Sequence, residues 1–192
     1  MSVTQSIDSV HQFARLIQIG VVLEELVETR ARAQTGAVEE PIRSHLEAAA
    51  ATAAEHRTRL LGVLDAIDAD HGPAEELQTL VQHRYEADQE FDHVLYEHLC
   101  NVETAYKFYE DLSEALDAST VALSVEGEAI PDRIAHLMAD ERRTVEATTD
   151  LLDELEGNSE AADGSEASDE SGASGAADGS GAPDDPTGGD RS

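Results

Sequence analysis

Cysteine is nearly absent from this sequence, in which Cys100 is the only one. A single thiol excludes an intramolecular disulfide, a zinc site with several thiolates and an iron centre ligated by four cysteines. Long apolar runs are also absent, since no stretch approaches the roughly 20 apolar residues of a membrane-spanning helix. Residues 1–9 have neither the basic region nor the apolar run of a signal peptide. These absences predict a cytoplasmic protein that does not cross a membrane.

Basic residues are scarce as well. Lys and Arg together number 12 against 42 Asp and Glu, which gives a formal net charge of -30, and Lys107 is the only lysine. Such a charge repels the nucleic-acid backbone and anionic membrane surfaces, so we expect neither as a partner. An acid-rich, lysine-poor surface is similar to that of proteins from salt-loving microbes. At molar salt the Debye length falls to about 3 Å, which screens the self-repulsion. The charge therefore predicts a halophilic protein.

Large apolar side chains disappear from the sequence after Leu155. Residues 157–192 consist almost entirely of Gly, Ser, Ala, Asp, Glu and Pro, and they contain no Val, Ile, Leu, Met, Phe, Tyr or Trp. Such a segment cannot bury enough apolar surface to offset the entropy of ordering. We therefore expect one folded domain at 1–156 and a disordered acidic tail at 157–192.

Before the tail, apolar residues recur at helical spacing in four segments. These segments are 6–34, 41–67, 74–118 (with a candidate break near His83) and 131–156. Thr35 and Gly36 end the first segment, Pro41 suits the first turn of the second, and 70–73 reads as a loop. No segment alternates as a sheet strand does. Four amphipathic helices bury their apolar stripes most simply in a four-helix bundle, so the expected fold class is all-α.

Polar residues interrupt the apolar stripe of every predicted helix. They are Glu24 and Glu28 in the first, His56 in the second, Glu103 in the third and Glu141 in the fourth. A buried carboxylate costs several kcal/mol unless it is paired, protonated or bound to a metal. One polar group near the middle of each helix therefore indicates a common internal site. We expect Glu24 or Glu28, His56, Glu103 and Glu141 to converge there.

The order of these residues resembles the ferritin-like superfamily, most closely its rubrerythrin branch. The resemblance is carried by EHRTRLL at 55–61, VETAYKFY at 102–109 and DERRT at 140–144, and it covers about residues 6–156. It implies a ferritin-like bundle with two irons or manganeses, held by one Glu from each of two helices and a Glu-x-x-His from each of the other two. It also implies oxidation of ferrous iron by peroxide or oxygen.

The sequence departs from the family pattern at two ligand positions. Ala53 stands where the family has a bridging glutamate, and Thr144 stands where it has a second histidine. The ligands that remain are three carboxylates and one imidazole, which suit a single iron or manganese ion. The predicted site is therefore an incomplete, degenerate version of the dimetal centre.

Several alternatives stay open at the level of sequence. His56 can be a core histidine bonded to a glutamate without any ion, in a non-enzymatic helical module for dimerisation or scaffolding, for example a homodimer. Tyr106 and Tyr109 are read as core aromatics. The spacing Glu90-x-x-His93 also matches the dimetal motif, with Glu86 and Glu97 on the same side, but polar neighbours favour a solvated face. The spacings His93-x-x-x-Glu97 and His136-x-x-x-x-Glu141 resemble hemerythrin, but the His-x-x-x-His pair that such a site needs is absent from the sequence.

Overall fold

The computed structural model describes residues 7–67, 79, 93–119, 124–125 and 128–166. It contains four long helices: α1 (Val10–Gln34), α2 (Ile42–Ala66), α4 (Val94–Asp117) and α5 (Ile130–Glu166). A short 3-10 helix, η1 (Thr35–Ala37), follows α1. Two-residue strands, β1 (Ser124–Val125) and β2 (Glu128–Ala129), form an antiparallel pair before α5. The predicted all-α class is confirmed, with this strand pair as a small addition.

The helices begin and end where local chemistry favours it. The Ser9 hydroxyl accepts a hydrogen bond from the Gln12 amide at 3.2 Å and caps α1. The helix ends at Gln34, next to the predicted stop, and Pro41 directly precedes α2. At the start of α4 the His93 ring accepts from the Leu95 amide. Residues 68–78 and 80–92, including the predicted loop and the break near His83, lie outside the described residues.

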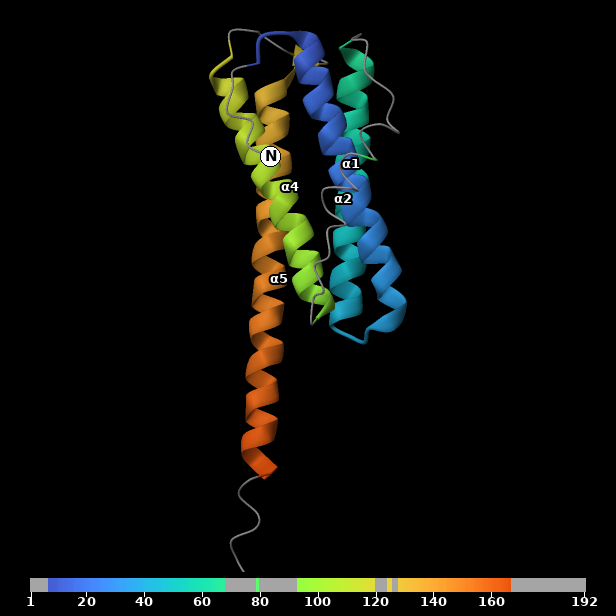
Figure 1. Cartoon of the computed structure of the whole chain (residues 1–192), viewed down its shortest axis with the longest axis vertical. Coiled ribbons are helices and arrows are strands. Elements are labelled where there is room, and N and C mark those ends of the chain that lie inside the picture. Colours follow the sequence, from blue (N-terminus) through green and yellow to red (C-terminus); the bar gives the residue numbers. More distant parts are fainter. Residues whose placement is uncertain (1–6, 68–78, 80–92, 120–123, 126–127, 167–192) are drawn as a thin grey trace, which may run out of the picture. The chain divides into compact units, whose positions relative to one another are not determined.

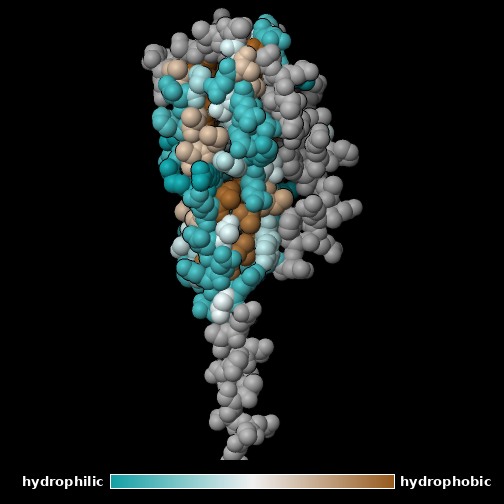
Figure 2. All heavy atoms as spheres, turned by 90° about the vertical axis from the view of Figure 1, so that its left-hand side faces the viewer, coloured by the Kyte–Doolittle hydropathy of each residue, from teal (hydrophilic) through white to brown (hydrophobic). Residues whose placement is uncertain are grey.

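Contacts divide the chain into two units, Met1–Leu155 and Glu156–Ser192. Within the first unit, α1 and α2 are antiparallel neighbours joined through η1, and α4 and α5 pack beside them (Figure 1). The largest apolar cluster lies between these helices and includes Phe13, Ile17, Leu60, Leu112 and Ile134. The face that carries α4 and α5 is mostly hydrophilic, with a narrow strip of apolar side chains among them (Figure 2). No described helix is both long and apolar enough for a membrane span.

Gly20 allows α1 to approach its neighbours closely at the level of the internal polar residues. A Cβ atom there would lie 3.2 Å from Leu60 Cδ1 on α2 and 3.2 Å from Phe108 Cε1 on α4. It would also lie 3.6 Å from the Tyr109 hydroxyl. The lack of a side chain at Gly20 therefore lets three helices meet one turn before Glu24.

The end of α5 differs from the prediction. We expected the helix to end near Glu156, but it continues to Glu166. The added turns contain Glu160, Ala161 and Ala162, which favour helix without needing a buried face. Of the predicted disordered tail at 157–192, residues 157–166 belong to α5, and residues 167–192 lie outside the described part of the chain. The assignment of 1–156 and 157–192 as separate domains stays a prediction.

Candidate metal centre

Three residues from three helices meet in the interior of the first unit. Glu24 of α1, His56 of α2 and Glu141 of α5 are all buried, and they place one ligand atom each within 4.8 Å of the others. His56 Nδ1 lies 2.9 Å from Glu141 Oε1 and 3.4 Å from Glu24 Oε1. Each residue follows the apolar stripe of its helix, which is why the fold turns all three inward. The group has the donor types of a transition-metal site.

The opposite nitrogen of His56 contacts a third carboxylate. His56 Nε2 lies 3.3 Å from Asp140 Oδ2, and the Asp140 carboxylate also contacts Arg143 and, at 3.6 Å, Arg59 Nη1. An ionised aspartate only accepts hydrogen bonds, so Nε2 carries the proton of this contact. This arrangement directs Nδ1 toward Glu24 and Glu141. A metal-ligating histidine is typically oriented by such a carboxylate on its other nitrogen.

Tyr109 is the contribution of α4 to this site. Its hydroxyl donates a hydrogen bond to Glu24 Oε1 at 2.5 Å, and both groups are fully buried. Burial raises the pKa of Tyr109 well above its ordinary value, and the charge of Glu24 raises it further. The hydroxyl therefore remains a donor and fixes the orientation of the Glu24 carboxylate. We predicted Tyr109 as a core aromatic, and its complete burial confirms that position.

The charges of the site are partly balanced by a proton. Burial alone would lower the pKa of His56, but hydrogen bonds to Glu141 and Glu24 and their charges raise it above its ordinary range. Burial raises the pKa of Glu141, and the charge of Glu24 adds to this against the opposing His56 contact. The hydrogen bond of 2.9 Å between His56 Nδ1 and Glu141 Oε1 requires a proton on one of these two atoms. A metal ion would have to take the place of this proton.

The hydrogen bonding of two carboxylate oxygens indicates whether the site suits a cation. Glu24 Oε2 and Glu141 Oε2 are buried, and neither has a hydrogen-bond partner among the described residues. A buried polar atom without a partner is costly, and a negatively charged one more so. A cation held by the same two carboxylates would remove this cost. The residues present therefore fit a single metal ion.

Glu28 is buried, but arginines already neutralise it. Its Oε2 lies 2.8 Å from Arg57 Nη2, and its Oε1 contacts Arg32 one turn along α1. The choice between Glu24 and Glu28 that the sequence left open therefore falls on Glu24. Glu28 belongs to a neighbouring ion pair network instead.

The prediction that Glu103 faces the interior is wrong, because its side chain is exposed. The buried face of α4 includes His98, Val102, Ala105 and Tyr109, at alternating steps of four and three. Glu103 follows Val102 by one residue, which turns it about 100° away from that face. The predicted convergence of four residues is thus reduced to three.

The two positions that depart from the family pattern have other roles. Ala53 is buried in a small apolar cluster with Val27 and Val102. The Thr144 hydroxyl donates to the Asp140 carbonyl oxygen at 3.3 Å. Neither side chain offers a ligand to the group around His56, so the described residues provide for one ion rather than two.

The rival motifs do not assemble in the described part of the chain. His93 caps α4, while Glu97 accepts from Gln34 Nε2 at 2.6 Å and lies 3.7 Å from Arg30 Nη1. Glu86 and Glu90 lie outside the described residues. His136 is exposed whereas Glu141 is buried, so these two residues do not share a site.

A cleft of about 340 Å³ between α2 and α5 reaches His56 from the surface. The residues that line it are mostly small or polar: His45, Ala48, Ala49, Thr52, Glu55, His56, Asp140, Arg143, Thr144 and Ala147. His56 lines the cleft although its side chain is only 1% exposed. The cleft therefore lies directly beside the candidate site.

Two contacts of the site could not be predicted from the sequence. In the sequence, Asp140 is one of many acidic residues and nothing distinguishes it. In the fold, Arg59 and Arg143 contact its carboxylate, and these contacts mark it as part of the site. Tyr109 was placed correctly, but its bond to Glu24 depends on the close approach of α1 and α4 at Gly20.

No protein-family model matches the chain, and no curated protein or solved structure is significantly similar to it.

Proposed function

We propose that this protein binds one iron or manganese ion per chain through Glu24, His56 and Glu141. The observation that carries the proposal is the set of three buried ligand atoms within 4.8 Å of one another, together with two unpaired carboxylate oxygens. One imidazole and two carboxylates suit both metals. We further propose a ferritin-like, rubrerythrin-type origin, in which the loss of ligands at Ala53 and Thr144 has reduced the dimetal centre to one ion.

The surrounding residues would prepare the site for the ion. Asp140 accepts from His56 Nε2 and so presents Nδ1 to the metal, while Tyr109 orients Glu24. Arg59 and Arg143 contact the Asp140 carboxylate and compensate its charge. When bound, such an ion would supply Lewis-acid or one-electron chemistry. The cleft beside His56 would admit the ion and a small molecule.

A second candidate function is supported by the proton at the site. A protonated His56 between Glu141 and Glu24 forms a buried ion cluster that needs no metal. Buried polar groups can specify the register of packed helices. In that case the protein is a non-enzymatic helical module for dimerisation or scaffolding.

Titration with Mn²⁺ tests the proposal. The full chain, first treated with chelator, is titrated in about 1 M KCl, because that salt screens weak binding to surface acids. We expect one Mn²⁺ per chain. Glu24→Gln, Glu141→Gln or His56→Ala should each weaken binding by more than about 100-fold, and Asp140→Asn by about 10- to 100-fold. Glu103→Gln is the matched control and should bind as the unchanged protein does.

Thermal unfolding separates the two candidate functions. If the site binds metal, Mn²⁺ raises the melting temperature of the unchanged protein and of Glu103→Gln but not that of His56→Ala. If the cluster is structural, Mn²⁺ shifts none of them. Equal Mn²⁺ affinity in the His56→Ala and unchanged proteins would refute the metal site.

A further inference from the structure

Two histidines from different helices pack against each other at a distance from the candidate metal centre. The ring centroids of His45 on α2 and His98 on α4 lie 5.5 Å apart, and the ring planes are almost perpendicular, at 83°. His45 precedes His56 by three helical turns, which is roughly 16 Å along α2. We propose that His45 and His98 together bind one Cu⁺ ion. The proposal is independent of the iron or manganese site, since neither histidine is a ligand there.

One nitrogen of His98 lacks a partner in the fold. Its Nε2 is buried and has no hydrogen-bond partner among the described residues, and the whole residue is only 1% exposed. An imidazole nitrogen in such a place has lost its hydration without gaining a hydrogen bond in exchange. A bound ion would give this nitrogen a partner and remove the cost of burying it.

The hydrogen bond between His45 and Thr148 defines the position of the proton on the His45 ring. The Thr148 hydroxyl donates its single proton to the Thr144 carbonyl oxygen at 2.7 Å. The hydroxyl therefore accepts in its 2.8 Å contact with His45 Nε2, and the ring proton lies on Nε2. In a neutral imidazole the other nitrogen, Nδ1, then carries a lone pair that can bind a metal ion.

Both rings are neutral at pH 7, which is the form of histidine that binds metals. Burial lowers the pKa of His45 below its ordinary value. Burial also lowers the pKa of His98 to about 4, with a smaller contribution from the charge of His45. At neutral pH, therefore, neither ring has to lose its second proton before an ion binds.

The number and type of the ligands favour Cu⁺ over other metal ions. Among the described residues, no Asp, Glu, Cys or further His joins the pair in a group with ligand atoms within 4.8 Å of one another. Imidazole suits copper, and Cu⁺ forms two-coordinate complexes, whereas zinc is almost always four-coordinate. With metal–nitrogen bonds of about 2 Å, an ion shared by two imidazoles holds the ring centroids about 5–6 Å apart. The observed 5.5 Å lies in this range.

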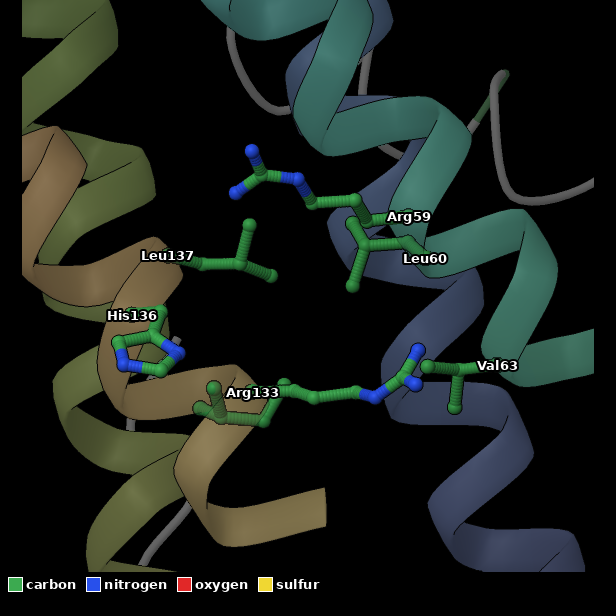
Figure 3. Close-up of a pocket in the computed structure, with 7 residues that line it drawn as sticks. Arg59, Leu60, Val63, Arg133, His136 and Leu137 are labelled. Carbon is green, nitrogen blue, oxygen red and sulfur yellow. The ribbon is translucent and has the colours of Figure 1, made fainter. Parts of the chain in front are cut away.

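The cleft between α2 and α5 connects the pair to the surface. His45 lines this cleft of about 340 Å³ and is partly exposed. Figure 3 shows another pocket between the same helices, of about 280 Å³, which neither His45 nor His98 lines. Its walls Leu60 and Leu137 are only 1% and 2% exposed, so they leave little surface for a ligand. The ion would therefore reach the pair through the cleft beside His45.

Titration with Cu⁺ under reducing, oxygen-free conditions tests the proposal. The full chain carries Cys100→Ser, because a free thiol binds Cu⁺ by itself, and it is first treated with chelator. Bathocuproine disulfonate competes for the ion and reports its free concentration. We expect one Cu⁺ per chain. His45→Gln and His98→Gln should each weaken binding by more than about 100-fold, because each removes one of two ligands.

His11→Gln and His56→Ala are the matched controls. His11 is exposed on α1 and His56 belongs to the other site, so both variants should bind Cu⁺ as the Cys100→Ser chain does. The proposal is overturned if the Cys100→Ser chain binds no Cu⁺. Affinities in His45→Gln and His98→Gln that equal that of the Cys100→Ser chain would overturn it as well.

X-ray absorption at the copper edge keeps the test decisive if a histidine variant does not fold, because it needs no substitution at either ring. The copper-loaded Cys100→Ser chain should show two imidazole ligands and no sulfur. A spectrum without imidazole scattering would refute the site.

Discussion

At the scale of single residues, His56 and His98 show how surroundings set the charge of a buried imidazole. His98 on α4 is almost completely buried, and its ring packs edge-on against that of His45 at a centroid distance of 5.5 Å. Burial, and to a smaller extent the charge of His45, lower the pKa of His98 to about 4. His56 lies among carboxylates, which raise its pKa instead. His98 is therefore neutral in the folded protein, and His56 carries or shares a proton.

Acidification should therefore destabilise the fold through His98. Its folded-state pKa lies below the ordinary 6.5, so the stabilisation is fully present above pH 6.5 and is lost as the pH falls toward 4. The shift in the pKa of His98 corresponds to about 3 kcal/mol of unfolding free energy. Denaturant unfolding between pH 7 and pH 4 should show a smaller loss of unfolding free energy in His98→Leu than in the unchanged protein. His11→Gln, at an exposed position, is the control, and an equal loss in all three proteins would contradict the assignment.

Tyr109 should act as a positioning residue for the metal ligand Glu24. Tyr109→Phe keeps the ring in the core but removes the hydroxyl that donates to Glu24. We expect Mn²⁺ affinity to fall by about 10-fold or more, as for other groups that orient a metal ligand. Tyr106→Phe, on the same helix and only half-buried, should leave the affinity unchanged. The same Mn²⁺ affinity in both variants would show that the hydroxyl does not orient Glu24.

The sequence was sufficient to predict Glu24, His56 and Glu141 as inward-facing, because each lies on an apolar stripe that a helix of 3.6 residues per turn turns inward. It failed at Glu103, because helical spacing also permits a face through Leu99, Glu103 and Tyr106. That face is one residue out of phase with the buried face through Val102 and Ala105. An error of one residue rotates a side chain by about 100°. Contacts such as that between Asp140 and His56 depend on how two helices meet, which spacing along one helix cannot define.

At the scale of whole elements, the helices themselves were predictable and their outer ends were less so. Gly36 and Pro41 are local signals, and α1 ends and α2 begins beside them, whereas α1 begins after Ser9 and not at residue 6 as predicted. The extension of α5 beyond Glu156 has no apolar face that a pattern could reveal. Helical propensity without burial is a weak signal, so the loss of apolar residues predicts an earlier end of the helix than the structure has.

Glycine substitutions test the close approach of α1 to α2 and α4. Gly62 is exposed on α2, and nothing lies within 4 Å of an added Cβ, so Gly62→Ala should stabilise the protein by about 0.5–1 kcal/mol. Gly20→Ala gains the same helix propensity but crowds Leu60 and Phe108 at 3.2 Å. We therefore expect a smaller gain or a net loss in its unfolding free energy. Equal gains for both variants would show that the helices are not in close contact at Gly20.

At the scale of the whole molecule, the net charge of -30 predicts that stability depends on salt. Only 12 basic residues are available to pair with 42 acidic ones, so self-repulsion opposes the compact state. Thermal unfolding followed by circular dichroism should give a melting temperature that rises from dilute buffer to about 2 M KCl. The same series with non-ionic sucrose serves as a control for general osmolyte effects. A melting temperature independent of KCl would contradict the proposed adaptation to high salt.

The most direct test of the metal-site proposal is elemental analysis of the protein purified in high salt without chelator. The account predicts one iron or manganese per chain in the unchanged protein and in Glu103→Gln. It predicts none in His56→Ala, because the imidazole is the only nitrogen ligand that the described residues offer at the site. An unchanged protein without metal, or a His56→Ala variant that retains one ion per chain, would contradict the account.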